Sequence, residues 1–423
     1  MNHTLSPLDG RYSGLTKKAV KYFSEFGLFK YRTLIEIEYY IQFCKLTKTP
    51  LVNSEETLRT LYMNFTDYDF FKIKEIENQT KHDVKAVEYF LRDKFKELGE
   101  THTHFIHYAL TSQDINNTAL PLSIKDFLQQ QLVPDLYLLS NMLESLTFLW
   151  KNDVMISRTH GQPAVPTTMG KEIKVFSYRL QEQLLKLDSF KLKGKFGGAV
   201  GNFNAHVYTY PTINWKEFGD LFLHSLGLER SQYTTQIDNY DNLAELFDCV
   251  KRINMILLDM CQDIWLYISQ EYLIQKKSKG QIGSSTMPHK VNPINFENAE
   301  GNLLLSTSLF ELFSKKLPVS RLQRDLTDST LTRNIGVAFG YLYVAIENIK
   351  LGLLKLELNR TALDDDLQKH TVVITEGIQT QMRKDGNENA YEIVKEKIDA
   401  HEMDEVYEEF NLKIKNYVGY STV

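Results

Sequence analysis

Apolar residues at alternating spacings of four and three constrain the fold of this chain most strongly. The mean spacing of 3.5 residues is the period of α-helices that pack nearly parallel in a bundle. Four such series predict an all-α fold with long central helices, several of them longer than 20 residues. Their members are Leu132, Leu136, Leu139, Leu143, Leu146 and Trp150; Met169, Ile173, Phe176, Leu180, Leu184 and Leu187; Leu246, Val250, Ile253, Leu257, Met260, Ile264 and Ile268; and Ile335, Phe339, Leu342, Ile346, Ile349, Leu353 and Leu356.

The composition agrees with a helical protein. The 21 glycines and 10 prolines make up about 7% of the 423 residues, against about 12% in average proteins, and helix interiors avoid both residue types. With 43% apolar residues, the chain is not intrinsically disordered. Strands and helices do not alternate, so a doubly wound nucleotide-binding fold is not expected. The other faces of the long helices are also apolar, as at residues 264–268, so we expect these helices to be buried against other subunits.

Charge and cysteine content exclude several classes of protein. The 49 basic and 54 acidic side chains give a net charge of −5, which argues against nucleic acid as a partner. Three scattered cysteines, Cys44, Cys249 and Cys261, form neither a disulfide framework nor a zinc site, and we expect the last two to be small buried residues. His102, His104 and His107 lack a nearby carboxylate in the sequence, so no metal site is predicted. The start of the chain has no secretion pattern and no run is long enough to span a bilayer, which predicts a cytoplasmic protein without a membrane partner.

Changes in pattern predict three domains. A charged helix ends near residue 100, and the heptad pattern is lost near residue 356. We therefore expect an N-terminal helical domain over residues 1–100, a central domain of long helices over 101–355 and a short C-terminal helical domain over 356–423. Irregular segments that join helices, rather than strands, are expected at 101–117, 156–168, 194–206, 278–293 and 316–334.

The segment 278–293 carries the densest set of polar side chains. Two adjacent serines, Ser284 and Ser285, follow two glycines and precede Lys290 and Asn292. A serine becomes reactive when nearby positive charge or N–H groups stabilise its alkoxide, and Lys290 and Asn292 are also suitable donors to a carboxylate. The alternative is an ordinary polar loop. A Gly-x-Ser-x-Gly sequence is absent, so an acyl-transfer hydrolase is not indicated.

Two further segments each allow a functional and a structural interpretation. His160 lies between a hydroxyl and a glycine just before a predicted helix, where it is an accessible acid or base, although a lone histidine is often structural. Thr111 and Ser112 precede the first bundle helix, and such a helix start suits a carboxylate or phosphate. The alternative there is a helix cap with Asp114 or Asn116 as the capping residue.

The remaining polar segments are less specific. The four glycines of residues 194–206 lack the features of a phosphate-binding P-loop, so a close backbone contact or a turn is expected. Near Ser329, three arginines could grip a phosphate or form a solvated ion-pair network; they are Arg321, Arg324 and Arg333. The pairs His82–Asp83 and Arg11–Tyr12 are polar outliers next to helices.

Taken together, the segments at 111–114, 159–164 and 283–293 resemble, in order and spacing, the three signature regions of the fumarase/aspartase superfamily. The stretches 6–12, 82–90, 233–237 and 323–330 are similar to the bacterial type of the adenylosuccinate lyase family. The resemblance runs from near residue 6 to about 390, beyond which the chain looks shorter than its relatives. It implies an all-helical, three-domain fold, a homotetramer whose central helices form one bundle, active sites that are each built from three chains, and no metal or organic cofactor.

The resemblance also implies an activity and a set of residues. The family splits adenylosuccinate into AMP and fumarate, and the succinylated carboxamide ribotide of purine synthesis into its amide and fumarate. Ser284 would be the base, His160 the acid and Glu297 the carboxylate that orients His160. Contacts to the phosphate and ribose would come from Arg11, Tyr12, Arg324, Ser329 and Arg333. Contacts to the succinyl part would come from Thr111, Ser112, Gln236, Lys290 and Asn292. Further ligand contacts would come from His82, Asp83, Ser285, Asn298 and Lys81, the last at a position where relatives usually have Asn.

Two other functions remain open from the sequence. A sibling lyase that acts on argininosuccinate, malate or aspartate would share the serine segment but would need no phosphate grip. The segments that contain Arg324 and His82 favour a nucleotide substrate. A catalytically inactive helical scaffold would lack the acid or the base, whereas both His160 and Ser284 are present.

Overall fold

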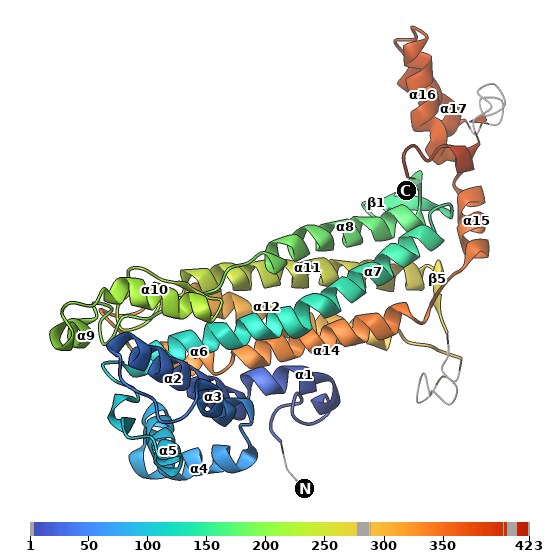
Figure 1. Cartoon of the computed structure of the whole chain (residues 1–423). Coiled ribbons are helices and arrows are strands. Elements are labelled where there is room, and N and C mark those ends of the chain that lie inside the picture. The colour runs from blue at the N-terminus through green and yellow to red at the C-terminus, as the bar shows by residue number, and fades with distance from the viewer. Residues whose placement is uncertain (1–3, 277–286, 288, 401, 404–412, 422–423) are drawn as a thin grey trace. The chain divides into compact units, whose positions relative to one another are not determined.

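The structure is a computed structural model that describes residues 4–276, 287, 289–400, 402–403 and 413–421, and it is built mainly of α-helices (Figure 1). The chain divides into two compact units. The first unit comprises Met1–Asp135, Leu184–Met255 and Asn302–Val344, and the second comprises Leu136–Gln183, Ile256–Gly301 and Ala345–Val423. The domain boundaries predicted near residues 100 and 356 stay a prediction.

The first unit is centred on helix α2 (Glu25–Thr47), which contacts α1 (Ser13–Phe23), α3 (Glu55–Met63), α5 (Asp83–Glu97) and α6 (Ser112–Phe127). An apolar cluster that includes Phe29, Ile37, Leu58 and Phe95 joins α2, α3 and α5 to α4 (Asp67–Thr80). The unit also contains the short elements η1 (Thr103–Phe105), η2 (Leu128–Leu132), β3 (Lys193–Gly194), α9 (Asn204–Thr209), α10 (Trp215–Ser225), β4 (Glu229–Arg230) and α13 (Thr327–Thr332).

The second unit contains two small antiparallel sheets and a C-terminal helical segment. Strand β1 (Val154–Thr159) pairs with β2 (Gln162–Thr168), and β5 (Leu273–Gln275) pairs with β6 (Leu356–Leu358). The remaining elements are α15 (Arg360–Lys369), η3 (Thr371–Ile374), α16 (Thr375–Lys384), α17 (Ala390–Asp399) and η4 (Ile414–Asn416). Ile374, Ile378, Val394 and Met403 form a separate apolar cluster.

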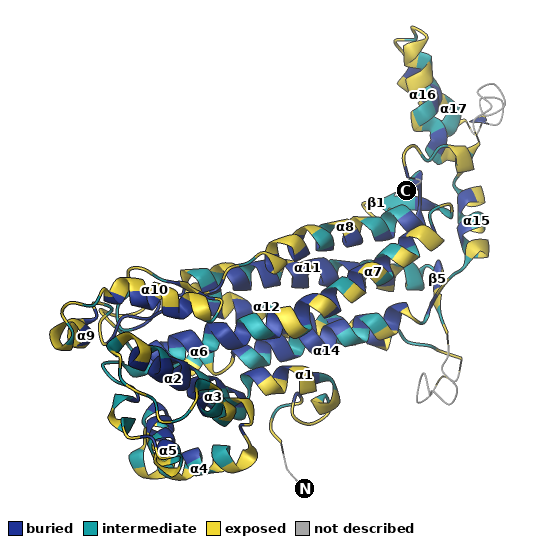
Figure 2. Ribbon diagram, viewed as in Figure 1, coloured by how far each residue is buried: buried dark blue, intermediate teal, exposed yellow. Residues whose placement is uncertain are grey.

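Five long helices have residues in both units and confirm the predicted long-helix pattern. They are α7 (Val133–Leu149), α8 (Met169–Asp188), α11 (Asp241–Ser269), α12 (Ile294–Lys316) and α14 (Ile335–Leu353). Helix α11 has 29 residues and α12 has 23. The four apolar series are buried along their lengths (Figure 2), except for Leu146 and Ile268, which are half-buried.

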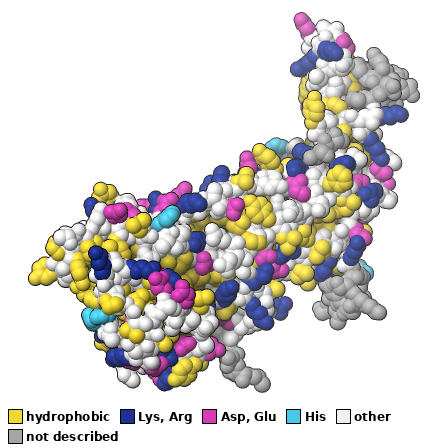
Figure 3. Space-filling view, viewed as in Figure 1, with side chains coloured by type: hydrophobic (Ala, Val, Ile, Leu, Met, Phe, Trp, Pro, Cys, Tyr) yellow, Lys and Arg dark blue, Asp and Glu magenta, His cyan; other side chains and the backbone are white. Residues whose placement is uncertain are grey.

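Large apolar side chains also lie on the outer faces of these helices. Phe148 and Leu149 of α7, Leu185 of α8 and Trp265 of α11 are exposed. Figure 3 shows hydrophobic side chains scattered among polar ones on the visible surface of the molecule. The three cysteines are buried, as expected for Cys249 and Cys261. None of the helices in the described part of the chain combines the length and the apolar character needed to cross a membrane.

The segment 156–168 lies between two helices, as expected, but the expectation that it is irregular is wrong. These residues form most of the β1–β2 hairpin, in which Thr159 pairs with Gln162 across a two-residue turn. Both turn residues, His160 and Gly161, have positive φ angles, of 53° and 75°, as in the type I′ turns that suit the twist of a hairpin. The pair His160–Gly161 did not indicate this hairpin, because type I′ turns usually have Asn-Gly, Asp-Gly or Gly-Gly at these two positions.

Candidate active site

A pocket of about 530 Å³ lies in the first unit. It brings together side chains from four distant segments of the chain, at residues 81–83, 112–117, 324–333 and within α2. Seven of the predicted site residues line it: Lys81, His82, Asp83, Ser112, Arg324, Ser329 and Arg333. One pocket in the first unit therefore brings together seven of the residues that were predicted to contact the substrate.

The segment 81–83 is shaped by the end of one helix and the start of the next. Lys81 ends α4 in the left-handed conformation, with a φ angle of 56°. His82 is the N-cap of α5, and its Nδ1 atom accepts a hydrogen bond from the Lys85 N–H at 3.2 Å. Asp83 is the first residue of α5, where free N–H groups and the helix dipole favour a negative charge. Local helix capping therefore places all three side chains at the pocket.

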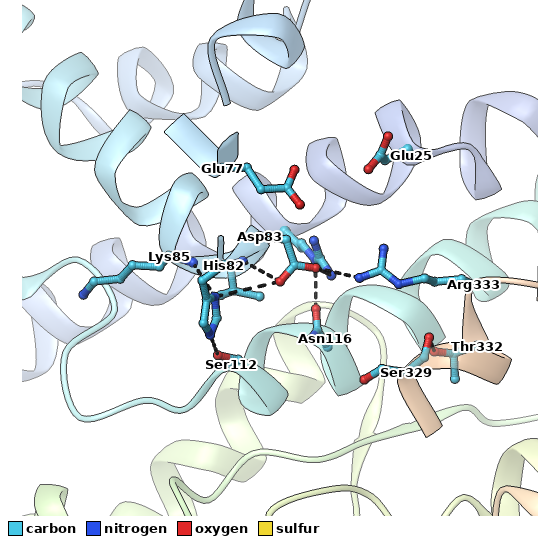
Figure 4. Close-up of polar contacts among 12 residues, drawn as sticks. Glu25, Glu77, His82, Asp83, Lys85, Ser112, Asn116, Ser329, Thr332 and Arg333 are labelled. Carbon is cyan, nitrogen blue, oxygen red and sulfur yellow. Dashed lines mark hydrogen bonds and ion pairs between the residues drawn. The ribbon is translucent and has the colours of Figure 1, made fainter. Parts of the chain in front are cut away.

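Asp83 is held between two guanidinium groups (Figure 4). Its Oδ2 atom lies 2.9 Å from a terminal nitrogen of both Arg32 and Arg333. Burial alone would raise the pKa of Asp83, but the charge of Arg32, a hydrogen bond from the Val84 N–H and the charge of Arg333 together lower it to about 2. Asp83 is therefore ionised at neutral pH.

Arg32 is a pocket residue that the sequence analysis missed. Its side chain is buried on α2, and its Nε atom donates a hydrogen bond to Asn116 Oδ1 at 2.8 Å. Burial lowers the pKa of Arg32, and the charge of Asp83 opposes that effect. No local motif marks this arginine. The available signal was a charged residue inside a helix that is apolar on most faces, because such a charge is buried only with a partner.

The arginines of the 316–334 segment have different environments. Arg324 donates hydrogen bonds to Ser329 Oγ at 3.0 Å and to Gln236 Oε1 at 3.3 Å. Arg321 is exposed and pairs with Asp325 at 3.1 Å. Arg324 and Arg333 line the pocket, whereas Arg321 does not. Gln236 does not line the pocket, but it contacts Arg324, which does.

The start of α6 is fixed by a buried ion pair. Thr111 is the N-cap, and Asp114 accepts a hydrogen bond from its N–H at 2.8 Å. The alternative in which Asp114 or Asn116 is the capping residue is therefore wrong, although Asp114 belongs to the capping box. The Asp114 carboxylate lies 2.8 Å from Lys195 Nζ, and both side chains are completely buried. Asp114 also accepts hydrogen bonds from the N–H groups of Gly197 and Gly198, which confirms the close backbone contact expected for this glycine-rich segment.

Ser112 then begins the helix beside His82, with its Oγ atom 3.5 Å from His82 Nε2. Thr111 itself does not line the pocket, and neither do Arg11 and Tyr12. Arg11 is exposed, and Tyr12 is the N-cap of α1. The predicted roles of these three residues stay predictions.

The second unit holds the other predicted residues. His160 is exposed at the turn of the β1–β2 hairpin. Glu297 lies in the first turn of α12 and accepts a hydrogen bond from Trp265 Nε1 at 3.2 Å, so its predicted role in orienting His160 stays a prediction. Lys290 is exposed, and Asn292 and Asn298 are half-buried. Ser284 and Ser285 lie outside the described residues.

The histidine cluster near residue 104 has a partner that the sequence did not reveal. His107 Nδ1 lies 2.6 Å from the buried carboxylate of Glu36. Burial would lower the pKa of His107, but the charge of Glu36 and its hydrogen bond raise it above its ordinary value. Over the described ranges, no group of three or more His, Cys, Asp or Glu side chains is arranged to hold a metal ion.

Comparison with solved structures first defines the fold. A fumarate lyase from Mesorhizobium sp. BNC1 matches with a TM-score of 0.77 and 15% identity, over 96% of both chains. A 3-carboxy-cis,cis-muconate lactonizing enzyme from Pseudomonas putida matches with a TM-score of 0.77 and 18% identity, over 96% of this chain and 94% of that one. The chain therefore has the same fold as these two enzymes.

Comparison of sequences then defines the family. A family described as "Lyase" matches residues 42–304, and one described as "Adenylosuccinate lyase C-terminal" matches residues 320–416. Adenylosuccinate lyase from Dictyostelium discoideum is 50% identical over 93% of this chain and 87% of its own length. That of Escherichia coli K12 is 44% identical over 93% and 88%. The chain belongs to the adenylosuccinate lyase family and is a C–N lyase, as the resemblance in the sequence implied.

Proposed function

We propose that this chain eliminates fumarate from adenylosuccinate, which gives AMP, and from the succinylated aminoimidazole carboxamide ribotide, which gives the free carboxamide ribotide. Both reactions belong to purine nucleotide biosynthesis. The observation that carries the proposal is the pocket of the first unit, in which Arg324, Ser329 and Arg333 lie together with His82. Proteins named adenylosuccinate lyase are similar to this chain over most of its length. Its volume of about 530 Å³ lies within the usual range of small-molecule sites.

The reaction needs a base, an acid and fixed donors. Ser284 removes a proton from the carbon beside a carboxylate, and the electron pair left behind is delocalised into that carboxylate. The pair then forms the C=C bond of fumarate while the C–N bond breaks, and His160 gives a proton to the departing nitrogen. Lys290 and Asn292 stabilise the doubly charged carboxylate of the intermediate, since donors aimed at developing charge lower such barriers most.

Two guanidinium groups support a phosphate at the pocket. Arg324 is half-buried and already bound to Ser329, so it can offer a pre-oriented donor pair to an anion. Arg333 is half exposed and pairs with Asp83, which already accepts a second guanidinium from Arg32. A phosphate can therefore take over Arg333 without leaving Asp83 unpaired. The sibling lyases act on substrates without phosphate and would not need these groups.

The exposed apolar side chains of the long helices support a homotetramer. Phe148, Leu149, Leu185 and Trp265 lie on α7, α8 and α11 and are exposed in a single chain. Apolar surface of this kind is removed from water when helices of several subunits pack into one bundle. In this arrangement, active sites are shared between subunits, and His160 and Ser284 of one site come from different chains. The enzyme acts in the cytoplasm, without a metal or organic cofactor.

A substrate panel tests the activity. The purified chain is incubated separately with adenylosuccinate, argininosuccinate, aspartate and malate, and ultraviolet absorbance and fumarate release are followed. We expect AMP and fumarate from adenylosuccinate and no product from the other three. Fumarate from argininosuccinate alone would identify a sibling lyase, and no fumarate from any substrate would identify an inactive scaffold.

Two variants test the acid and the base. His160→Ala and Ser284→Ala should each lower kcat by about 10²- to 10⁴-fold and still bind adenylosuccinate. His224→Ala, at an exposed histidine in α10, is the matched control and should keep normal turnover. Mixed oligomers of the two inactive variants should regain activity because some sites contain both intact residues. A Ser284→Ala enzyme of near-normal rate would show that the base is another group.

A further inference from the structure

The position of His160 is set by the backbone of its hairpin. Among the described residues, the His160 side chain has no hydrogen-bond partner, and it is exposed at the turn. The pairing of β1 with β2 is also irregular, because the register shifts between Ile156 and Arg158. Such a bulge changes the direction of a strand and of the side chains that follow it. A contact that fixes the strand just after the bulge would therefore fix the direction of the turn.

Arg158 makes such a contact. Its Nη1 atom donates hydrogen bonds to Tyr272 Oη at 2.7 Å and to Gln270 Oε1 at 3.2 Å, and its Nη2 atom donates to Asp366 Oδ2 at 2.7 Å. The Tyr272 hydroxyl also donates to Asp366. One guanidinium therefore ties β1, two residues before His160, to the connection between α11 and β5 and to α15. Figure 1 shows α15 beside β1, and these two elements are in contact.

The partners of Arg158 belong to a well-supported frame. Tyr272 is buried, and its carbonyl accepts a hydrogen bond from the Asn359 N–H at 2.9 Å. The next residues form β5, which pairs with β6, and α15 follows β6 directly. Burial would raise the pKa of Asp366, but hydrogen bonds from Tyr272 and Arg158 lower it. Asp366 therefore remains a charged acceptor for the guanidinium.

We propose that Arg158 is a positioning residue that holds the His160 hairpin in the orientation needed for proton transfer, through its bonds to Tyr272 and Asp366. Arg158 itself does not contact the substrate in this proposal, which rests on the proposed role of His160 as the acid. The planar fork of arginine reaches Tyr272 and Asp366 with different nitrogens, whereas a lysine offers a single point charge and can replace only part of this contact.

The chain offers a matched control at the base of the same hairpin. Arg360 of α15 donates to Asp153 at 2.7 and 3.1 Å, just before β1 begins. This pair also joins α15 to the hairpin segment, but it lies on the far side of the bulge from the turn, and Arg360 is largely exposed. If the contact between α15 and the hairpin serves only stability, substitution of either arginine should have a similar effect on activity. If Arg158 positions His160, only the substitution of Arg158 should lower activity.

The test compares Arg158→Gln, Arg158→Lys and Arg360→Gln by steady-state kinetics with adenylosuccinate, with folding checked by circular dichroism. A displacement of about 1 Å can cost about 100-fold in rate, so we expect Arg158→Gln to lower kcat by about 10- to 100-fold with little change in KM. Arg158→Lys should recover part of this loss, and Arg360→Gln should stay within about twofold of the wild type. Equal kcat values for Arg158→Gln and Arg360→Gln would overturn the proposal.

Two further variants separate the possible failures. If Arg158→Gln does not fold, Tyr272→Phe and Asp366→Asn each remove one partner, and each should lower kcat while KM is retained. Normal kcat in both would equally overturn the role of Arg158. The proposed function is tested independently by His160→Ala. If that variant has normal turnover, the assignment of His160 as the acid fails, whatever Arg158 does.

Discussion

Replacement of Lys195 by methionine should destabilise the protein strongly. Lys195 Nζ lies 2.8 Å from Asp114 Oδ1 and 2.5 Å from the Gly198 carbonyl, and both ionic side chains are completely buried. Methionine has nearly the length of lysine but carries no charge and no donor. The substitution therefore removes the positive charge and leaves the Asp114 carboxylate buried in the first turn of α6.

The size of the loss in stability depends on the groups that still contact Asp114 in the variant. Removing one partner of a buried ion pair typically costs about 3–5 kcal/mol, because the other charge stays in a poorly polarisable environment. Asp114 keeps hydrogen bonds from the N–H groups of Thr111, Gly197 and Gly198. These donors stabilise the carboxylate, so we expect a loss at the low end, about 3 kcal/mol in the free energy of unfolding.

Urea unfolding, followed by circular dichroism at a fixed protein concentration, measures this loss. Arg59→Met is the control, because Arg59 pairs with Glu38 between two helices of the same unit but is part exposed, and such a pair contributes less. In the double variant with Asp114→Asn, the loss should be smaller than the sum of the single losses by about 1 kcal/mol or more. A Lys195→Met protein within about 1 kcal/mol of the wild type would refute the reasoning.

Two other predictions concern the pocket. Asp83→Asn should lower the free energy of unfolding at pH 7 by up to about 2.5 kcal/mol, because the pKa of Asp83 is lowered from 3.8 to about 2 in the folded protein and each pKa unit corresponds to about 1.4 kcal/mol. A lowered carboxyl pKa stabilises the folded protein at pH values above the pKa of the unfolded state. The difference in free energy of unfolding between the variant and the wild type should therefore shrink as the pH falls from about 4 to 2, as measured by urea titrations. A difference that does not change over this range would contradict the assignment. Arg324→Gln should raise KM for adenylosuccinate by about 10- to 100-fold, as expected for a lost charge-assisted hydrogen bond. Arg321→Gln, at the exposed arginine nearby, is the control and should leave KM unchanged. Equal KM values for the two variants would exclude Arg324 from phosphate binding.

Much of the helical architecture could be predicted because it depends on local periodicity. The members of the four apolar series are buried almost without exception, since a side chain spaced at 3.5 residues faces the same neighbour along the whole helix. The segments at 82, 112 and 324 could be singled out for a related reason. Their polar side chains lie at helix ends and in turns, where backbone groups lack partners within the helix.

The errors have equally specific causes. The hairpin at His160 was missed because its turn places a histidine, not a glycine or asparagine, in the left-handed conformation. One open alternative made Asp114 or Asn116 the cap of α6, but the N-cap is Thr111, and the Asp114 carboxylate three residues later accepts a hydrogen bond from the Thr111 N–H. In both cases several local solutions have similar energies, and contacts from distant segments decide among them.

Spacing and residue type were thus sufficient to identify the class of fold, the polar segments and the family. Contacts between distant segments could not be predicted from spacing and residue type. Arg32 with Asp83, Lys195 with Asp114, and Arg158 with Tyr272 and Asp366 each join residues at least 50 positions apart in the chain. A buried charge is stable only where packing supplies its partner at hydrogen-bond distance, and that partner is chosen by the packing of whole helices rather than by neighbours in the sequence.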